Sequence, residues 1–448
     1  MLLSIPVGVF LALDKTGFFG RAFGVNANLV IDAGSSFNIE AGVWRNLAQG
    51  GEENARMLSP VVELIKPLAP RYIRIDHVLD YYDVVSRGGD GKLSFNWTKL
   101  DLTINDILAA GAKPFISLSY TPPVISKSNV TDIPVNWADW ESAVESLIEH
   151  VSGRIGLNIP EVYYEVWNEP DLFGRFALSG EKNYYDLYFH SAVGAARAGN
   201  VQSFKLGGPA TTGLYESWFK GLLKFAGSSG LKLDFLSWHT YSKDLNRFED
   251  DNIKARVWLT EFPQFSNVEL IISEAGINSE NDKGYDSPFS AIHTIATAVL
   301  LEGEISKMFS FEIKDGPGPE KFWGRWGMIT HEKWGTPEVK PRYRALQFLN
   351  QMRGKKVNVA GEGSWVKAFA KEEGGVIRLL VVNYDPQGKH FETVPMSFIN
   401  LPYKNFSFRR KDFSGETKEQ KVSVEGTSWQ TNEGVKTNSA AIFTITPI

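Results

Sequence analysis

The stretch Tyr164-Glu165-Val166-Trp167-Asn168-Glu169-Pro170 reads as a short apolar strand that ends in an Asn-Glu pair just before a proline. A carboxylate withdrawn from water at a strand end costs free energy unless it is paired or protonated. We therefore interpret Glu169 as a tuned acid rather than a solubilising charge. A single carboxylate does not define a reaction, so a second one in a similar position is needed.

Glu274 is such a residue, because it closes the apolar run 268–273 and is followed by Ala275 and Gly276. Hydrolysis of a glycosidic bond uses two carboxyl groups, one to protonate the leaving oxygen and one to attack or to activate water. Glu274 lies 105 residues after Glu169. A barrel of roughly 250 residues spends at least ~31 residues on each β/α unit, so this interval corresponds to about three units. The spacing predicts that Glu169 follows strand four and Glu274 strand seven.

Short apolar runs alternate with longer segments of helical period along most of the chain. The apolar runs are 23–31, 72–76, 114–119, 163–167, 205–208, 235–238, 268–273 and 307–311. Eight alternations predict an α/β fold, a (β/α)8 or TIM barrel, rather than an open doubly wound sheet. No Gly-x-Gly-x-x-Gly follows an early strand, which removes the main argument for a dinucleotide-binding fold.

The C-terminal hundred residues have a different sequence pattern. From Gly375 onward, short runs such as 376–382, 406–408 and 441–445 alternate or stay apolar and are separated by turns, which is typical of a β-sandwich. A chain of 448 residues exceeds the size at which single cores stop growing, roughly 300 residues. We predict a barrel over 18–350 and an accessory β-sandwich made of 1–17 plus 351–448, to which the run 7–13 adds a strand.

Several segments taken in order give the chain a family resemblance. They are 113–119 (KPFISLS), 167–171 (WNEPD), 207–210 (GGPA), 234–241 (DFLSWHTY) and 272–274 (ISE). The chain resembles glycoside hydrolase family 39, within the clan of (β/α)8 retaining glycosidases, over most of residues 20–350. That family contains β-xylosidases, α-L-iduronidases and some endo-acting glycanases. The resemblance implies that Glu169 is the acid/base and Glu274 the nucleophile.

The two glutamates need opposite protonation states, because an acid must carry a proton while a nucleophile must be ionised. Arg74 and Asp76 share a face of strand two, so Arg74 could support a carboxylate at the barrel mouth. The alternative for Arg74 is an ion pair with Asp76 itself. The alternative for Glu274 is a salt bridge that closes strand seven.

Glu169 also has a structural alternative, an ion pair with Arg175 or Lys182. Beside it, Asn168 by resemblance binds the sugar 2-hydroxyl, whereas the alternative is a turn residue before proline.

His239 and Tyr241 stand two residues apart at the end of strand six, so an extended backbone places both on one side. By resemblance, Tyr241 hydrogen-bonds the nucleophile and His239 contacts the sugar. The alternative for His239 is a satisfied core histidine.

The chain departs from the family pattern on strand two. The family commonly reads Arg-x-His there, whereas this sequence reads Arg74-Ile75-Asp76-His77. Either Asp76 replaces the sugar-binding histidine, or a bulge presents His77.

A second departure lies at the end of strand eight, which lacks the tryptophan platform of the clan. Phe311, Trp323 or Trp326 could supply the flat apolar face on which a sugar stacks. Glu312 and Lys314, also at the mouth, could bind a charged or unusual sugar, but we expect solvated loop charges.

Composition excludes several other functions. The net charge of −5 provides no basic field for nucleic acid or an anionic membrane, and no apolar run reaches the ~18 residues of a membrane helix. The chain has no cysteine, no His-Glu-x-x-His and no His-x-His in 24–28, so we expect neither a metal nor another cofactor. Residues 1–13 lack a basic n-region and read as a strand rather than a signal peptide, which slightly favours a cytoplasmic protein over a secreted one.

These observations predict a retaining glycoside hydrolase that acts on an oligosaccharide or polysaccharide by double displacement, with xylosidase-like exo action first. Two alternatives stay open: an endo-acting glycanase of the same family, and a non-catalytic carbohydrate-binding barrel. Retention of the anomeric configuration requires carboxyl groups about 5 Å apart, whereas inversion of that configuration requires a separation of ~6.5 to 9.5 Å.

Overall fold

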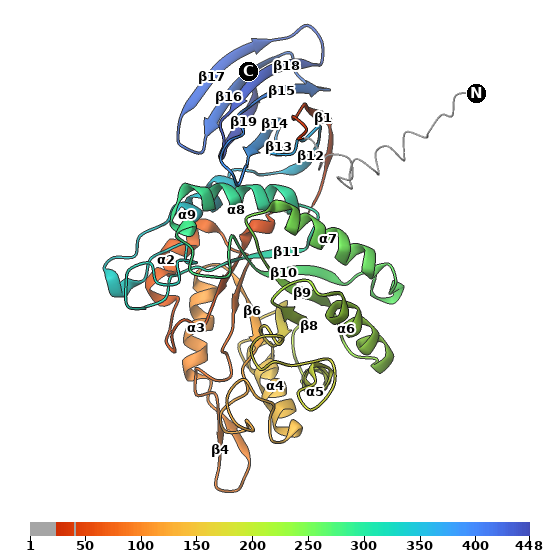
Figure 1. Ribbon diagram of the computed structural model, residues 1–448, viewed down its shortest axis with the longest axis vertical. Coiled ribbons are helices and arrows are strands. Elements are labelled where there is room, and N and C mark those ends of the chain that lie inside the picture. Colours follow the sequence, from red (N-terminus) through yellow and green to blue (C-terminus); the bar gives the residue numbers. More distant parts are fainter. Residues whose placement is uncertain (1–23, 40–41) are drawn as a thin grey trace, which may run out of the picture. The chain divides into compact units, whose positions relative to one another are not determined.

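The computed structural model describes residues 24–39 and 42–448. The chain divides into two compact units. Gly42–Ala291 with Leu301–Gln347 form the barrel unit, and Ile292–Leu300 and Phe348–Ile448 form the sheet unit together with the described part of Met1–Ala41. Figure 1 shows both. No helix in the described ranges is long and apolar enough to cross a membrane.

The barrel unit contains a closed sheet of parallel strands, which confirms the predicted (β/α)8 fold (Figure 1). In order around the barrel the strands are β2 (Asn46–Gln49), β3 (Tyr72–Ile75), β6 (Lys113–Leu118), β7 (Val162–Val166), β8 (Phe204–Thr211), β9 (Phe235–Tyr241), β10 (Glu269–Gly276) and β11 (Lys307–Phe311). Because β7 is the fourth strand and β10 the seventh, Glu169 and Glu274 lie where their spacing predicts.

Helices follow the strands, and side chains cap the starts of three of them. Asn136, Asn183 and Asp244 each accept a hydrogen bond from a backbone N–H two residues on, at the starts of α4, α5 and α7. The α-helices are α2 (Val62–Ile65), α3 (Thr98–Ala109), α4 (Trp137–Val151), α5 (Tyr184–Arg197), α6 (Glu216–Ser229), α7 (Leu245–Leu259), α8 (Pro288–Leu301) and α9 (Pro341–Leu349). Short 3-10 turns are Val43–Arg45, Ser59–Val61, Lys66–Leu68, Pro263–Phe265, Lys283–Asp286 and Glu332–Trp334, and a small hairpin pairs β4 (Val85–Arg87) with β5 (Leu93–Phe95).

Large side chains fill the inside of the barrel. Phe115 lies at the centre, with its ring centroid 4.7 Å from Phe309 and 5.3 Å from Tyr163. The cluster is completed by Ala48, Tyr72, Phe235 and Ile271. Because this layer closes the interior, polar chemistry is confined to the carboxyl ends of the strands.

The first barrel strand was predicted wrongly. The run 23–31 overlaps β1 (Leu29–Phe37), which pairs with β12 and β15 of the other sheet, whereas β2 occupies the first barrel position. β2 is only four residues long and is buried throughout, so it shows no alternation. The amide groups at its two ends donate within the protein: Asn46 to Val43 O and Gln49 to Glu312.

The sheet unit is a nine-stranded sheet in the order β17-β16-β19-β14-β13-β12-β1-β15-β18. The C-terminal strands are β12 (Lys355–Ala360), β13 (Val366–Glu373), β14 (Val376–Asn383), β15 (Glu392–Ile399), β16 (Asn405–Asp412), β17 (Thr417–Ser423), β18 (Trp429–Val435) and β19 (Ser439–Pro447). Trp429 of β18 packs 4.6 Å from Phe408 of β16, near the opposite end of the strand order. The sheet therefore curls into a sandwich around one apolar core. The strand expected at 7–13 lies outside the described residues.

Candidate active site

A buried arginine organises the mouth of the barrel. Arg74 of β3 is fully buried, and its guanidinium donates to Glu274 Oε1 at 2.8 Å, to Glu165 Oε2 at 2.7 Å and to Asn168 Oδ1 at 2.8 Å. These three acceptors, rather than Asp76, are its hydrogen-bond partners. A buried guanidinium is stabilised only when carboxylates surround it, and here they come from two other strands.

Glu274 accepts hydrogen bonds at both carboxyl oxygens. Arg74 donates to one, and the hydroxyl of Tyr241 donates to Oε2 at 2.6 Å. Burial, with Glu169 nearby, raises the pKa of Glu274, although His239, Arg74 and the Tyr241 hydrogen bond act in the opposite direction and favour the ionised form. Glu274 is thus a buried carboxylate held by donors from the second and sixth strands.

Glu169 and Glu274 converge on one histidine. His239 Nδ1 lies 2.8 Å from Glu169 Oε1 and 3.5 Å from Glu274 Oε2, and one oxygen of each glutamate lies within 4.8 Å of the other. Burial lowers the pKa of His239, but the two carboxylates outweigh burial and raise it. Lys182, a structural alternative for Glu169, instead pairs with Asp132 at 3.2 Å.

The neighbours of Glu169 form a hydrogen-bonded network. Asn168 accepts from Arg74, and its amide nitrogen donates to Tyr120 Oη at 3.0 Å and to Asp76 Oδ2 at 3.4 Å. Asn168 is 5% exposed, so both ends of its side chain are held by the protein. The Nε2 atom of His239 is buried and has no hydrogen-bond partner among the described residues.

The chain turns sharply after β3, at the position where its sequence departs from the family pattern. His77 has a φ of 53°, its Nδ1 lies 2.8 Å from Asp80 Oδ2, and its ring stacks 3.9 Å from that of Tyr81. Asp76 is buried beside Asn168, and its Oδ1 has no partner in the described part of the chain. Asp76 therefore lies in the network of the two glutamates, whereas His77 is turned toward Asp80.

The three candidate stacking aromatics lie in different surroundings. Phe311 ends β11, with its ring edge-on to Tyr241 at 6.3 Å and to Trp326 at 6.1 Å. Trp323 is 39% exposed. A Cβ placed on Gly316 would lie 3.0 Å from both Glu52 Oε2 and Trp323 Cδ1, so these two side chains meet at that glycine. Phe311 thus contacts the residue that binds Glu274, and Trp323 lies farther along the rim.

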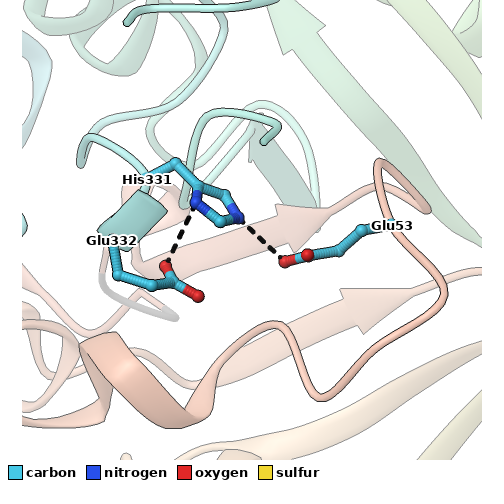
Figure 2. Close-up of side chains that lie close together, drawn as sticks. All are labelled: Glu53, His331 and Glu332. Carbon is cyan, nitrogen blue, oxygen red and sulfur yellow. Dashed lines mark hydrogen bonds and ion pairs between the residues drawn. The ribbon is translucent and has the colours of Figure 1, made fainter. Parts of the chain in front are cut away.

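The prediction of solvated charges at Glu312 and Lys314 is wrong, because both are at most 1% exposed. The loop after β11 folds against 326–329: Glu312 N donates to Trp326 O, and Met328 N donates to Glu312 O. Lys314 Nζ donates to Glu53 at 3.1 Å and to both oxygens of Glu332 at 2.9 and 3.0 Å. His331 lies between the two glutamates, as Figure 2 shows.

Two histidine-carboxylate groups in the described residues are compact enough to be considered as metal sites: Glu53, His331 and Glu332, and Glu169, His239 and Glu274. In the first, Lys314 already supplies the positive charge. In the second, Arg74 and Tyr241 already occupy both oxygens of Glu274. In both groups, protein donors therefore compete with a cation for the carboxylate oxygens.

Sequence reasoning missed three residues of the site: Glu165, Tyr120 and Glu52. A signal existed for Glu165, since a charge inside the apolar strand Tyr164-Glu165-Val166 must find a buried partner. Glu52 follows β2, the strand that was misplaced. Tyr120 carries no sequence signal, because its contact with Asn168 depends on how β6 and β7 lie side by side.

A (β/α)8 barrel whose fourth and seventh strands place two glutamates this close, one against an arginine and a tyrosine and the other against a histidine, defines the class of barrel glycoside hydrolases. The chain belongs to the glycosyl hydrolases of family 39, whose family model matches residues 53–379.

Sequence relatives have two kinds of activity. The chain is 28% identical over 345 residues to a β-xylosidase of Caldicellulosiruptor saccharolyticus, covering 70% of this chain and 69% of that protein. It is 28% identical over 322 residues to a β-xylosidase of Geobacillus stearothermophilus, covering 63% and 62%. It is 26% identical over 213 residues to the α-L-iduronidase of Homo sapiens, covering 43% and 31%.

Solved structures share the fold. A family 39 enzyme from Xanthomonas axonopodis pv. citri has a TM-score of 0.76 at 21% identity, covering 96% of this chain and 99% of that one. A monomeric β-xylosidase from Caulobacter crescentus CB15 has a TM-score of 0.77 at 20% identity, covering 94% and 100%.

Proposed function

We propose that this glycoside hydrolase is a retaining, β-xylosidase-like exo-glycosidase. The observation that carries the proposal is the close approach of Glu169 and Glu274, with one oxygen of each within 4.8 Å. Retaining enzymes hold their carboxyl groups about 5 to 5.5 Å apart, whereas inverting enzymes leave ~6.5 to 9.5 Å for a water molecule.

The surroundings of the two glutamates support different roles. Glu274, held by Arg74 and Tyr241, attacks the anomeric carbon and forms a glycosyl-enzyme, while Glu169 gives its proton to the leaving oxygen. Glu169, now ionised, then takes a proton from water, whose oxygen displaces Glu274. His239 touches both carboxyl groups and keeps Glu169 oriented through the two half-reactions.

The β-xyloside assignment rests on the two xylosidase relatives, which match longer stretches of the chain than the iduronidase does. An endo-acting glycanase of the same family is the first alternative, and polysaccharide substrates distinguish the two. A non-catalytic carbohydrate-binding barrel is the second. The retained pair of glutamates, together with both donors to Glu274, disfavours it.

The test is hydrolysis of 4-nitrophenyl β-D-xyloside followed by proton NMR. We expect β-xylose to appear first and to equilibrate later. An α-anomer appearing first would refute retention. Sugar binding without hydrolysis, unaffected by Glu274→Gln, would instead support the binding barrel. Glu63→Gln removes an exposed carboxylate of α2 that is 81% accessible and serves as the charge-matched control.

A further inference from the structure

One buried carboxylate near the two glutamates has no part in the proposed mechanism. Glu165 lies on β7, four residues before Glu169, and is 0% exposed. Side chains two residues apart on a strand share a face, so Glu165 lies on the face of Tyr163, which belongs to the cluster inside the barrel. By the same rule Arg74 of β3 lies on the face of Tyr72. Glu165 and Arg74 therefore meet in the layer between the barrel interior and the mouth.

The two oxygens of Glu165 are bound unequally. Oε2 accepts from Arg74 Nε at 2.7 Å, whereas Oε1 is buried and has no partner among the described residues. Glu141 of α4 is also buried, but His190 Nδ1 lies 2.6 Å from its Oε1 and Arg197 Nη1 lies 2.6 Å from its Oε2. A buried carboxylate with one unsatisfied oxygen costs stability. The arrangement of Glu165 therefore indicates a role besides holding the fold together.

Arg74 connects Glu165 to the reacting groups. Its guanidinium donates through Nε to Glu165, through Nη1 to Glu274 Oε1 at 2.8 Å and through Nη2 to Asn168 Oδ1 at 2.8 Å. The guanidinium is planar and rigid, so the bond at Nε fixes the directions in which both terminal nitrogens point. Glu165 thus sets the orientation of the hydrogen bond that Glu274 receives.

Glu165 also offsets part of the positive charge that Glu274 experiences. Burial lowers the pKa of Arg74, but Glu165 first and Glu274 next outweigh burial and raise it. Arg74 therefore stays charged, and two carboxylates share its charge. Because a negative charge on the far side of Arg74 weakens the attraction that keeps Glu274 ionised, removing that charge should lower the pKa of Glu274.

Several other titratable or charged groups interact with Glu274, and none of them changes when Glu165 is substituted. They are Arg74 on β3, Tyr120 after β6, Glu169 after β7, His239 and Tyr241 on β9, Glu312 after β11 and Glu52 after β2. A change in the pKa of Glu274 in such a variant therefore reports the loss of the charge on Glu165.

Resting on the glycosidase function above, we propose that Glu165 is a positioning residue for the nucleophile, which orients the Arg74 guanidinium and limits the positive charge that reaches Glu274. A carboxylate that is held too strongly as an anion is a weaker nucleophile, so this limit favours attack on the anomeric carbon. The same bond at Nε keeps the other terminal nitrogen on Asn168.

The experiment is a carbon NMR titration of the full chain labelled at its glutamate carboxyl carbons, with the Glu274 signal assigned by its loss in Glu274→Gln. Glu165→Gln keeps an acceptor for Arg74 Nε and removes only the charge, so the titration midpoint of Glu274 should move down by at least about 0.5 pH. Glu141→Gln removes a buried carboxylate that also binds an arginine, and should leave that midpoint unchanged. An unmoved midpoint in Glu165→Gln, or equal shifts in the two variants, would overturn the proposal. Glu165→Met removes the same charge and takes the place of a Gln variant that does not fold.

Turnover of an aryl xyloside tests the orienting role. Glu165→Asp keeps the charge but is one methylene shorter, so it draws the guanidinium away from Glu274. We expect kcat/KM to fall at least about tenfold, because a displacement of ~1 Å can cost ~10²-fold. The titration midpoint of Glu274 should not fall in this variant. Turnover like that of the parent, or failure of the Asp variant to fold, would reject the orienting role.

The NMR titration needs no turnover, so this inference and the proposed function fail separately. A lowered midpoint of Glu274 in Glu165→Gln, in a protein whose parent hydrolyses no glycoside, would reject the proposed hydrolysis and retain the sharing of charge through Arg74. Hydrolysis by the parent together with an unmoved midpoint would do the reverse.

Discussion

The barrel unit contains two clusters built from the same residue types with opposite consequences. In the first, His331 lies between Glu53 and Glu332 (Figure 2). Lys314 donates to both glutamates, and His331 Nδ1 accepts from Lys333 N. In the second cluster Arg74 donates to Glu165 and Glu274, whereas Glu169 pairs with His239. Both glutamates of the first cluster therefore bind a permanent cation, while in the second Glu169 pairs with a group that can itself gain or lose a proton. That difference, rather than residue type, separates the two clusters.

The largest effect is expected from Glu274→Ala, which removes the proposed nucleophile. Turnover of an aryl xyloside should fall by ~10⁴-fold or more, because the proposed covalent intermediate forms on Glu274. The fold should persist, since the change also removes a buried negative charge. Steady-state kinetics with the melting temperature as a folding control measures this. Retention of more than a few per cent of activity would place the nucleophile elsewhere.

Glu169→Ala should give a smaller loss that depends on the leaving group. We expect a loss of ~10²- to 10⁴-fold on xylobiose but a far smaller one on a 2,4-dinitrophenyl xyloside, because that phenolate needs little protonation. The comparison is the ratio of kcat/KM between the two substrates in the variant and in the parent. Equal losses on both would argue against Glu169 as the acid.

Substitutions in the cluster of Glu53, His331, Glu332 and Lys314 should change the stability of the protein rather than its catalytic activity. Lys314→Met leaves Glu53 and Glu332 without their cation and should lower the free energy of unfolding by about 3 kcal/mol, as expected for breaking a buried pair. Lys99→Met, in an ion pair whose side chains are 61% and 75% exposed, should change it by less than about 0.5 kcal/mol. Urea denaturation measures both. Similar values for the two lysines would show that the buried cluster contributes no more than a surface pair.

The order of strands in the barrel was predictable from sequence because seven strands are apolar runs bounded by polar segments. β2 is hard to recognise in the sequence. It has only four residues and all are buried, so it shows neither the length nor the alternation by which strands are identified. The run at 23–31 is more apolar and therefore resembles a first barrel strand more closely. Parallel strands buried on both faces carry this ambiguity in general.

The candidate site was predictable only in part. Arg74 as a support for a carboxylate follows from strand periodicity, but its bond to Glu165, 91 residues away in sequence, depends on barrel closure. The sequence favours solvated side chains for Glu312 and Lys314 because both lie in a polar loop. That loop folds back on 326–329 and removes both from water, which no local pattern encodes.

Adjacent residues allow the smallest and most selective test, because Glu52 interacts electrostatically with Asp76 and Glu274, whereas Glu53 binds Lys314. Burial, with Asp76 and Glu274 nearby, raises the pKa of Glu52 from an ordinary 4.5 to about 7. At Glu53 the net shift is downward: burial acts to raise the pKa, but hydrogen bonds from His331 and Lys314 outweigh burial and lower it. The contributions of these two carboxylates to the free energy of unfolding should therefore change with pH in opposite directions.

Between pH 4.5 and about 7 the folded state holds a proton on Glu52 that the unfolded state has lost, so stability falls as pH rises through this window. Glu52→Gln should therefore stabilise the protein at pH 8, by roughly 1 to 2 kcal/mol after solvent screening, and change little at pH 4.5. Glu53→Gln should destabilise it at pH 8, because the ionised Glu53 is the form that Lys314 binds, and this loss should shrink only as the pH falls through the lowered pKa of Glu53. Thermal unfolding of both variants across pH 4 to 8 is the measurement. Parallel curves would mean that the surroundings of Glu52 and Glu53 are electrostatically equivalent, and would remove the basis for assigning the two residues different roles.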